Sequence, residues 1–156
     1  MKEFAAWLAT GSLSVVIQKN EVWVIPTIQS IHIVGIGVVL GCVLMLTLRL
    51  LGMAGMDRTL LQVTRRFGPW LTGALVLLLV TGLALIVGEP ERELLAFSFW
   101  LKMTLVVLGT ILTWWAGHAN AKPLSVLTLF IWIGIIFLGR LIAYDHIWGS
   151  WSGSKA

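Results

Sequence analysis

Four long, predominantly apolar stretches constrain the fold of this chain more than any other feature of its sequence. They run from about residue 23 to 50, 69 to 88, 95 to 118 and 123 to 148. A helix needs about 20 such residues to cross the hydrocarbon core of a bilayer. Hydrophobic residues make up 58% of the 156 and charged residues only 12%, about half the charged share of a soluble domain. We therefore expect an all-α integral membrane protein, with one domain built as a four-transmembrane-helix bundle.

A shorter segment, from about residue 3 to 18, precedes the first of these spans. Its residues Phe4, Trp7, Leu8, Gly11 and Val15 recur as on one face of a helix, and charged or polar residues stand at both ends. This pattern is typical of a short amphipathic helix that lies in the membrane interface.

The basic residues indicate how the bundle is oriented in the membrane. Most of them stand in the connection between the first two spans and in the connection between the last two: Arg49, Arg58, Arg65, Arg66 and Lys122. The remaining connection has Arg92 beside three glutamates. Short cytoplasmic loops are enriched in Lys and Arg, so we expect both termini on the outer side. Membrane orientation also accounts for the pI of about 9.7, and we expect a lipid bilayer rather than nucleic acid as the partner.

Three ionisable residues stand inside the apolar spans, where they are costly and mark functional sites. At 1.5 Å per residue, His32 lies about 13 Å from the outer surface, Lys102 about 10 Å and Arg140 about 12 Å. No Asp or Glu is expected at the level of Arg140. One imidazole and two cations from three helices are thus predicted at one level of the outer leaflet.

A b-type haem is the cofactor that best fits such a set. The His32 imidazole would bind the iron, and Lys102 and Arg140 would neutralise the two propionates. Small residues on the same helix, Gly35, Gly37 and Gly41, would let the porphyrin approach its backbone. Tyr144 shares a helix face with Arg140 and could bond a propionate or a quinone carbonyl, and Gln29 would line the same pocket.

Other interpretations of these residues stay open. His32 could be a structural histidine bonded to a backbone carbonyl, and Lys102 could extend to the interface. Arg140 needs an anion from a ligand, a lipid headgroup or a partner chain. His118 lies about 20 Å from His32 along the bundle, so it would hold a second haem or be an interfacial residue at a helix end. The sixth ligand of an outer haem is unassigned.

Several short motifs resemble those of an uncharacterised bacterial family of small four-helix inner-membrane proteins. They are Ile31-His32-Ile33-Val34-Gly35, Leu48-Arg49-Leu50-Leu51-Gly52, Phe99-x-x-Lys102, His118, and Gly139-Arg140-Leu141-Ile142-Ala143-Tyr144. The resemblance covers most of the chain from about Ile31 onward. That family tends to carry an acidic residue where this chain has Thr47, so a charge pair for Arg49 is not implied. The resemblance implies a bacterial inner membrane, and both termini would then be periplasmic.

The chain is also distantly similar to cytochrome-b-like and copper-export membrane modules, which implies haem or a metal. The leading hypothesis is a haem-b protein or anchor subunit that moves electrons between quinone and a periplasmic partner. The alternatives are a non-redox module that binds an anion, lipid or small solute, and a structural subunit of a larger complex. No acid–base pair or nucleophile motif is present, so we expect no independent catalysis. Gly37-x-x-x-Gly41 could pack within the bundle or between protomers of a homo-oligomer.

Overall fold

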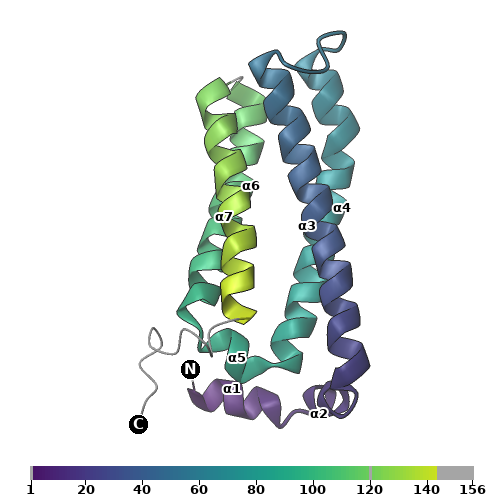
Figure 1. The fold of residues 1–156 in the computed structure, drawn as a ribbon, viewed down its shortest axis with the longest axis vertical. Helices are drawn as coiled ribbons and strands as arrows, with labels where there is room; N and C mark the ends of the chain where they lie inside the picture. The colour runs from purple at the N-terminus through teal and green to yellow at the C-terminus, as the bar shows by residue number, and fades with distance from the viewer. Residues whose placement is uncertain (1, 120, 144–156) are drawn as a thin grey trace.

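A computed structural model describes residues 2–119 and 121–143 of the chain, and within them every regular element is an α-helix. Four long helices run along the molecule, and short helices lie at one end of it (Figure 1). The long helices are α3 (Glu21–Leu51), α4 (Leu60–Gly88), α6 (Phe97–Ala119) and α7 (Lys122–Ala143). The short ones are α1 (Lys2–Ala9), α2 (Ser12–Lys19) and α5 (Pro90–Leu94).

The four long helices have the length and the surface of membrane spans. They contain 22 to 31 residues each, which is about 33 to 46 Å of helix against a hydrocarbon core of about 30 Å. Large apolar side chains cover the outside, such as Trp70 and Phe137, each 68% exposed. Because water would not stabilise such a surface, the chain is a multi-pass membrane protein. The predicted all-α four-helix bundle is confirmed.

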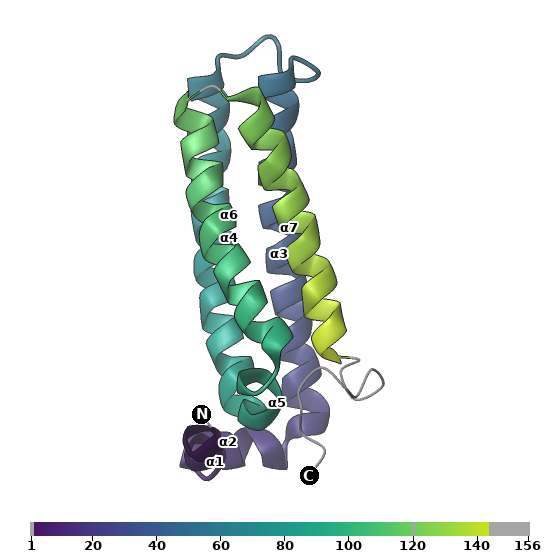
Figure 2. The same cartoon turned by 90° about the vertical axis from the view of Figure 1, so that its left-hand side faces the viewer.

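The bundle is built from two helix pairs. Helix α3 packs against both α4 and α7, and α6 packs against α7, as expected for antiparallel neighbours with a short connection (Figure 2). The core that joins three of the helices consists of Val39, Val43, Ala74, Trp132 and Ile135. In the described part of the chain, α4 and α6 form no extended interface. The packing between neighbouring long helices is therefore weakest between α4 and α6.

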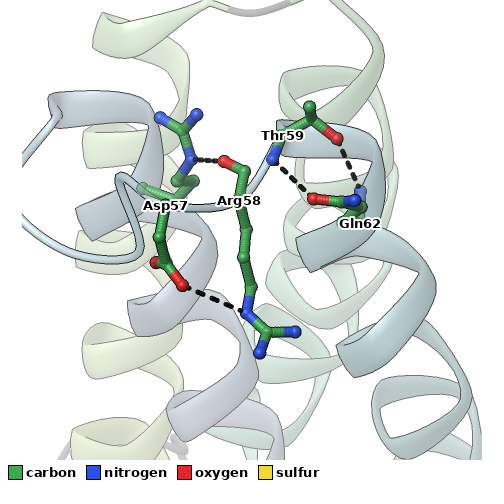
Figure 3. Close-up of polar contacts among 5 residues, drawn as sticks. Asp57, Arg58, Thr59 and Gln62 are labelled. Carbon is green, nitrogen blue, oxygen red and sulfur yellow. Dashed lines mark hydrogen bonds and ion pairs between the residues drawn. The ribbon is translucent and has the colours of Figure 1, made fainter.

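The second span begins earlier than its sequence predicts. The expected first residue of this span, Pro69, lies inside α4, which begins nine residues before it. A capping box sets the true start, because the Thr59 hydroxyl accepts from the Gln62 backbone N–H and the Gln62 side chain accepts from the Thr59 N–H. Figure 3 shows this pair. The expected connection of about 18 residues shrinks to residues 52–59, where Gly52 has φ 77° and ends α3.

The N-terminal segment consists of two short helices rather than the one expected over 3–18. The helix is interrupted at Gly11, where a Cβ atom would come within 3.1 Å of the Leu8 carbonyl oxygen. Both helices lie across the end of the bundle (Figures 1 and 2). Ala5 of α1 packs against Leu94, Ala96 and Phe99, so α1 is attached to the connection between α4 and α6. Phe4 and Trp7 stay exposed, as an interfacial helix requires.

The observed bounds of the third and fourth spans differ little from the expected bounds, within the residues that the structure describes. The third span, expected over 95–118, is α6, and the fourth, expected over 123–148, is α7 as far as Ala143. The α3–α4 connection with Arg58 and the start of α7 at Lys122 lie at one end of the bundle, and α1, α2 and α5 lie at the other. Which end faces the cytoplasm stays a prediction from the charges.

Candidate functional site

Three polar residues from three different helices lie on the inner faces of the bundle near the end that carries α5. His32 shares a row with buried Ile25, Val39 and Val43 of α3. The spacing of these residues is that of one helix face. His32 itself is half-buried. It therefore projects toward the interior and not toward lipid.

Lys102 and Thr81 occupy the same kind of position on α6 and α4. Lys102 is in register with buried Gly109, Thr113 and Ala116 on one face of α6. It is half-buried, and its Nζ lies 5.4 Å from the centre of the Phe99 ring, within the range of a cation–π contact. Thr81 shares the inner row of α4 with Val63, Ala74 and Gly88. The Lys102 side chain therefore projects from the inner face of α6.

A short hydrogen bond links His32 to Thr81. His32 Nδ1 lies 2.7 Å from Thr81 Oγ1, and Thr81 Oγ1 lies 2.7 Å from the carbonyl oxygen of Leu77, one turn earlier. A carbonyl can only accept, so the single hydroxyl proton of Thr81 is donated to Leu77 and its oxygen accepts from Nδ1–H of the histidine.

Trp132 and Thr113 form a second hydrogen-bond relay, in which a threonine hydroxyl accepts from a side-chain N–H and donates to a carbonyl of its own helix. Trp132 Nε1 lies 3.1 Å from Thr113 Oγ1, which in turn lies 2.6 Å from the Gly109 carbonyl oxygen. An indole N–H is only a donor, so Thr113 must accept from it and donate to its own helix. The same arrangement at His32 gives the tautomer with the proton on Nδ1, and Nε2 keeps its lone pair.

Two glycines near His32 have different roles. A Cβ atom on Gly82 would lie 3.7 Å from His32 Cε1, so the Cε1 edge of the imidazole lies close to α4 at Gly82. Gly35, expected to let a porphyrin approach the helix, lies against α4. A Cβ there would meet Leu78 Cδ2 at 3.0 Å, so Gly35 lets α3 and α4 pack closely. Gly37 and Gly41 have no atom within 4 Å of a Cβ and face outward.

The charges around this group differ from the sequence expectation in one respect. Lys102 is within electrostatic range of His32, as predicted from their depths. It is also within range of Glu93 of α5, although no acidic residue was expected to act at this level. The short helix α5 brings Glu93 back toward the start of α6, and this turn was not expected from the sequence. Lys102 therefore has an acidic neighbour at the end of the bundle.

Arg140 lies at the level of His32 but off the inner face. The Thr47 hydroxyl donates to the Ser125 carbonyl at 3.1 Å and sets the register of α3 against α7. His32 lies fifteen residues before Thr47 and Arg140 fifteen residues after Ser125, so each is about 22 Å from that bond. The Arg140 side chain is exposed, whereas an arginine at this depth was expected to face the interior.

The other predicted site residues are not gathered here. Gln29 is exposed and lies off the inner row of α3. His118 is exposed at the opposite end of the bundle, where its Nδ1–H donates to the Trp114 carbonyl at 2.7 Å. Tyr144 lies outside the described residues.

No set of protein ligands for a bare metal ion is present in the described part of the chain, where no three His, Cys, Asp or Glu side chains come together. A haem requires fewer protein ligands than a bare metal ion, because the porphyrin supplies four nitrogen ligands and the protein supplies one or two. The His32 imidazole is the side chain in this group that would bind a haem iron. The donor set therefore fits a haem better than a bare copper ion.

Comparison with known proteins adds no relative to this picture: no family model, curated protein or solved structure matches the chain. The resemblance in short motifs thus stays a prediction.

Thr81, Gly82 and Glu93 were not singled out from the sequence. Thr81 lies seven residues before Gly88, so the depth count used for Lys102 would have placed it beside His32. Threonine draws little attention inside a span because its hydroxyl bonds its own helix.

Proposed function

We propose that this protein binds a b-type haem near the α5 end of the bundle and moves electrons between quinone and a partner on that side. The observation that carries the proposal is the His32 imidazole. Its Nδ1 lies 2.7 Å from Thr81 Oγ1 on the inner side of the bundle, and Lys102 lies within electrostatic range of the ring. A metal-bound histidine almost always donates its other N–H to a protein acceptor.

The residues of this chain would divide the work as follows. Thr81 would hold the ring orientation of His32 through their hydrogen bond, and the His32 imidazole would bind the haem iron. Lys102 would pair with a propionate from the inner face of α6, and Arg140 could reach another from the surface of α7 at the same level. The apolar core of Val39, Val43 and Ile135 lies beyond His32 and excludes water. When bound, the haem supplies one-electron chemistry.

A second candidate function rests on the same cation. Lys102 lies on the inner face of α6, and no second histidine lies near His32 among the described residues. These features favour a site for a small anionic molecule that Lys102 would pair with and His32 would hydrogen-bond. Such a protein would be colourless, whereas a haem protein absorbs visible light.

The test is to express the protein with ample haem, purify it in detergent and measure haem per chain by the pyridine haemochrome assay. The proposal predicts haem in the wild type, its loss in His32→Ala, and normal haem in the control His118→Ala. Size-exclusion chromatography in detergent would establish that His32→Ala is folded. Haem retained by folded His32→Ala would refute the role of this histidine.

A further inference from the structure

The end of the bundle opposite the proposed haem site carries a shallow groove. It is lined by Asp57, Arg58, Gln62, Arg65 and Arg66, which lie in the α3–α4 connection and the first turns of α4. We propose that this groove binds the phosphate of an anionic phospholipid, whose acyl chains lie along the exposed face of α4. The proposal does not depend on haem binding.

Hydrogen bonds hold the groove in shape. Arg49 Nε donates to the Arg58 carbonyl oxygen at 2.7 Å, which ties the connection to the end of α3. The Arg58 side chain lies 3.6 Å from the Asp57 carboxylate, and Thr59 with Gln62 fixes the start of α4 (Figure 3). The groove is therefore already formed before a ligand enters.

The charge of the groove suits a phosphate group. It combines three guanidinium groups with one carboxylate. In the part of the chain that the structure describes, the ion pair at this groove joins Asp57 to Arg58. Arg65 and Arg66 lie three and four residues after Gln62, on the same side of α4, and both are exposed. Planar guanidinium groups bind phosphate through paired hydrogen bonds, so these two arginines would make the main contacts.

The surface next to the groove argues for a lipid and not for free phosphate. From Arg66 toward the C-terminal end of α4, the same helix face continues with Pro69, Trp70, Gly73, Val76 and Val80. Trp70 is 68% exposed, Val76 56% and Val80 59%, and a Cβ on Gly73 would have no atom within 4 Å. This strip is apolar and open along the membrane-spanning part of α4. A ligand that touches both surfaces needs a phosphate head and a hydrocarbon tail.

The experiment is native mass spectrometry and thermal unfolding of the detergent-purified protein with added phosphatidylglycerol. Phosphatidylcholine and inorganic phosphate serve as separate probes. We expect phosphatidylglycerol to bind and to raise Tm, with little effect of the other two. Each basic residue near an anionic lipid contributes roughly fivefold in affinity, so Arg65→Gln/Arg66→Gln should weaken binding about 30-fold. The control Lys122→Gln removes a cation at the same end of the bundle, outside the groove, and should bind normally.

Other outcomes would overturn the proposal. Equal binding of phosphatidylcholine would mean that charge is not recognised, and a full Tm shift with inorganic phosphate would mean that the α4 strip takes no part. Unchanged affinity in the double variant, or an equal loss in Lys122→Gln, would exclude this groove. Arg65→Lys/Arg66→Lys keeps the charges and guards against a folding defect, because it should keep phosphatidylglycerol selectivity at reduced affinity.

Discussion

Replacing Thr81 with valine tests the relay that sets the tautomer of His32. Valine keeps the size of the side chain but cannot accept from Nδ1–H, which now bonds Thr81 at 2.7 Å. Hydrogen bonds between transmembrane helices contribute about 0.6 kcal/mol on average and at most about 1.7 kcal/mol. Because His32 is only half-buried, we expect a loss of about 1 kcal/mol in the free energy of unfolding. The proton can then move to Nε2, which would remove the ligand lone pair.

The matched control is Thr113→Val, which breaks the same kind of relay beside Trp132. Trp132 is only 3% exposed, so its indole N–H would lack water as a substitute partner and the loss of stability should be at least as large. Stability is measured by equilibrium unfolding in mixed micelles, and haem affinity by absorbance titration. We expect Thr81→Val to weaken haem binding about 10- to 100-fold, as losing a hydrogen-bond partner of a metal ligand does, and Thr113→Val to leave it unchanged. Equal haem affinity in both variants would refute the relay argument.

Three further perturbations have distinct expected results. Gly35→Leu would place a side chain against Leu78, whose Cδ2 would lie 3.0 Å from the new Cβ. We expect it to lower the free energy of unfolding in micelles by about 1–3 kcal/mol. The control Gly37→Leu, whose Cβ would have no atom within 4 Å, should leave that free energy nearly unchanged. Thr59→Ala removes the cap of α4 and should cost about 1 kcal/mol in the same assay; an unchanged stability would mean that the capping box is not formed. Lys102→Gln should lower haem content without unfolding the protein, and normal haem content would remove Lys102 from the site.

The helices could be predicted because membrane spans depend on length and hydropathy alone. The ends of the helices were harder to predict, because the sequence offers two start signals for α4, a proline and a capping box, and the capping box marks the actual start. The sequence Thr59-Leu60-Leu61-Gln62 was sufficient to identify the cap. A membrane helix tolerates an internal proline because neighbouring groups compensate for the missing hydrogen bond. Pro69 was therefore a weak boundary signal.

Of the residues in the candidate site, His32 and Lys102 could be predicted from the sequence, whereas Thr81, Gly82 and Glu93 could not. His32 and Lys102 stand out because an ionisable group inside a span is costly. Thr81 and Gly82 carry no such cost, so only the packing of α3 against α4 reveals them. The side on which Arg140 lies depends on how α7 is rotated against α3, and hydropathy does not determine that rotation. The role of Gly35 likewise depended on which residue of α4 faces it.

The central claim is that the His32 site holds a haem, and the most direct measurement is an absorption spectrum. The protein would be produced with ample haem, purified in detergent and recorded as a dithionite-reduced minus oxidised difference spectrum. The account predicts the sharp α-band of a b-type haem, with one haem per chain. A flat spectrum from folded protein would contradict it and would leave Lys102 as the centre of an anion site.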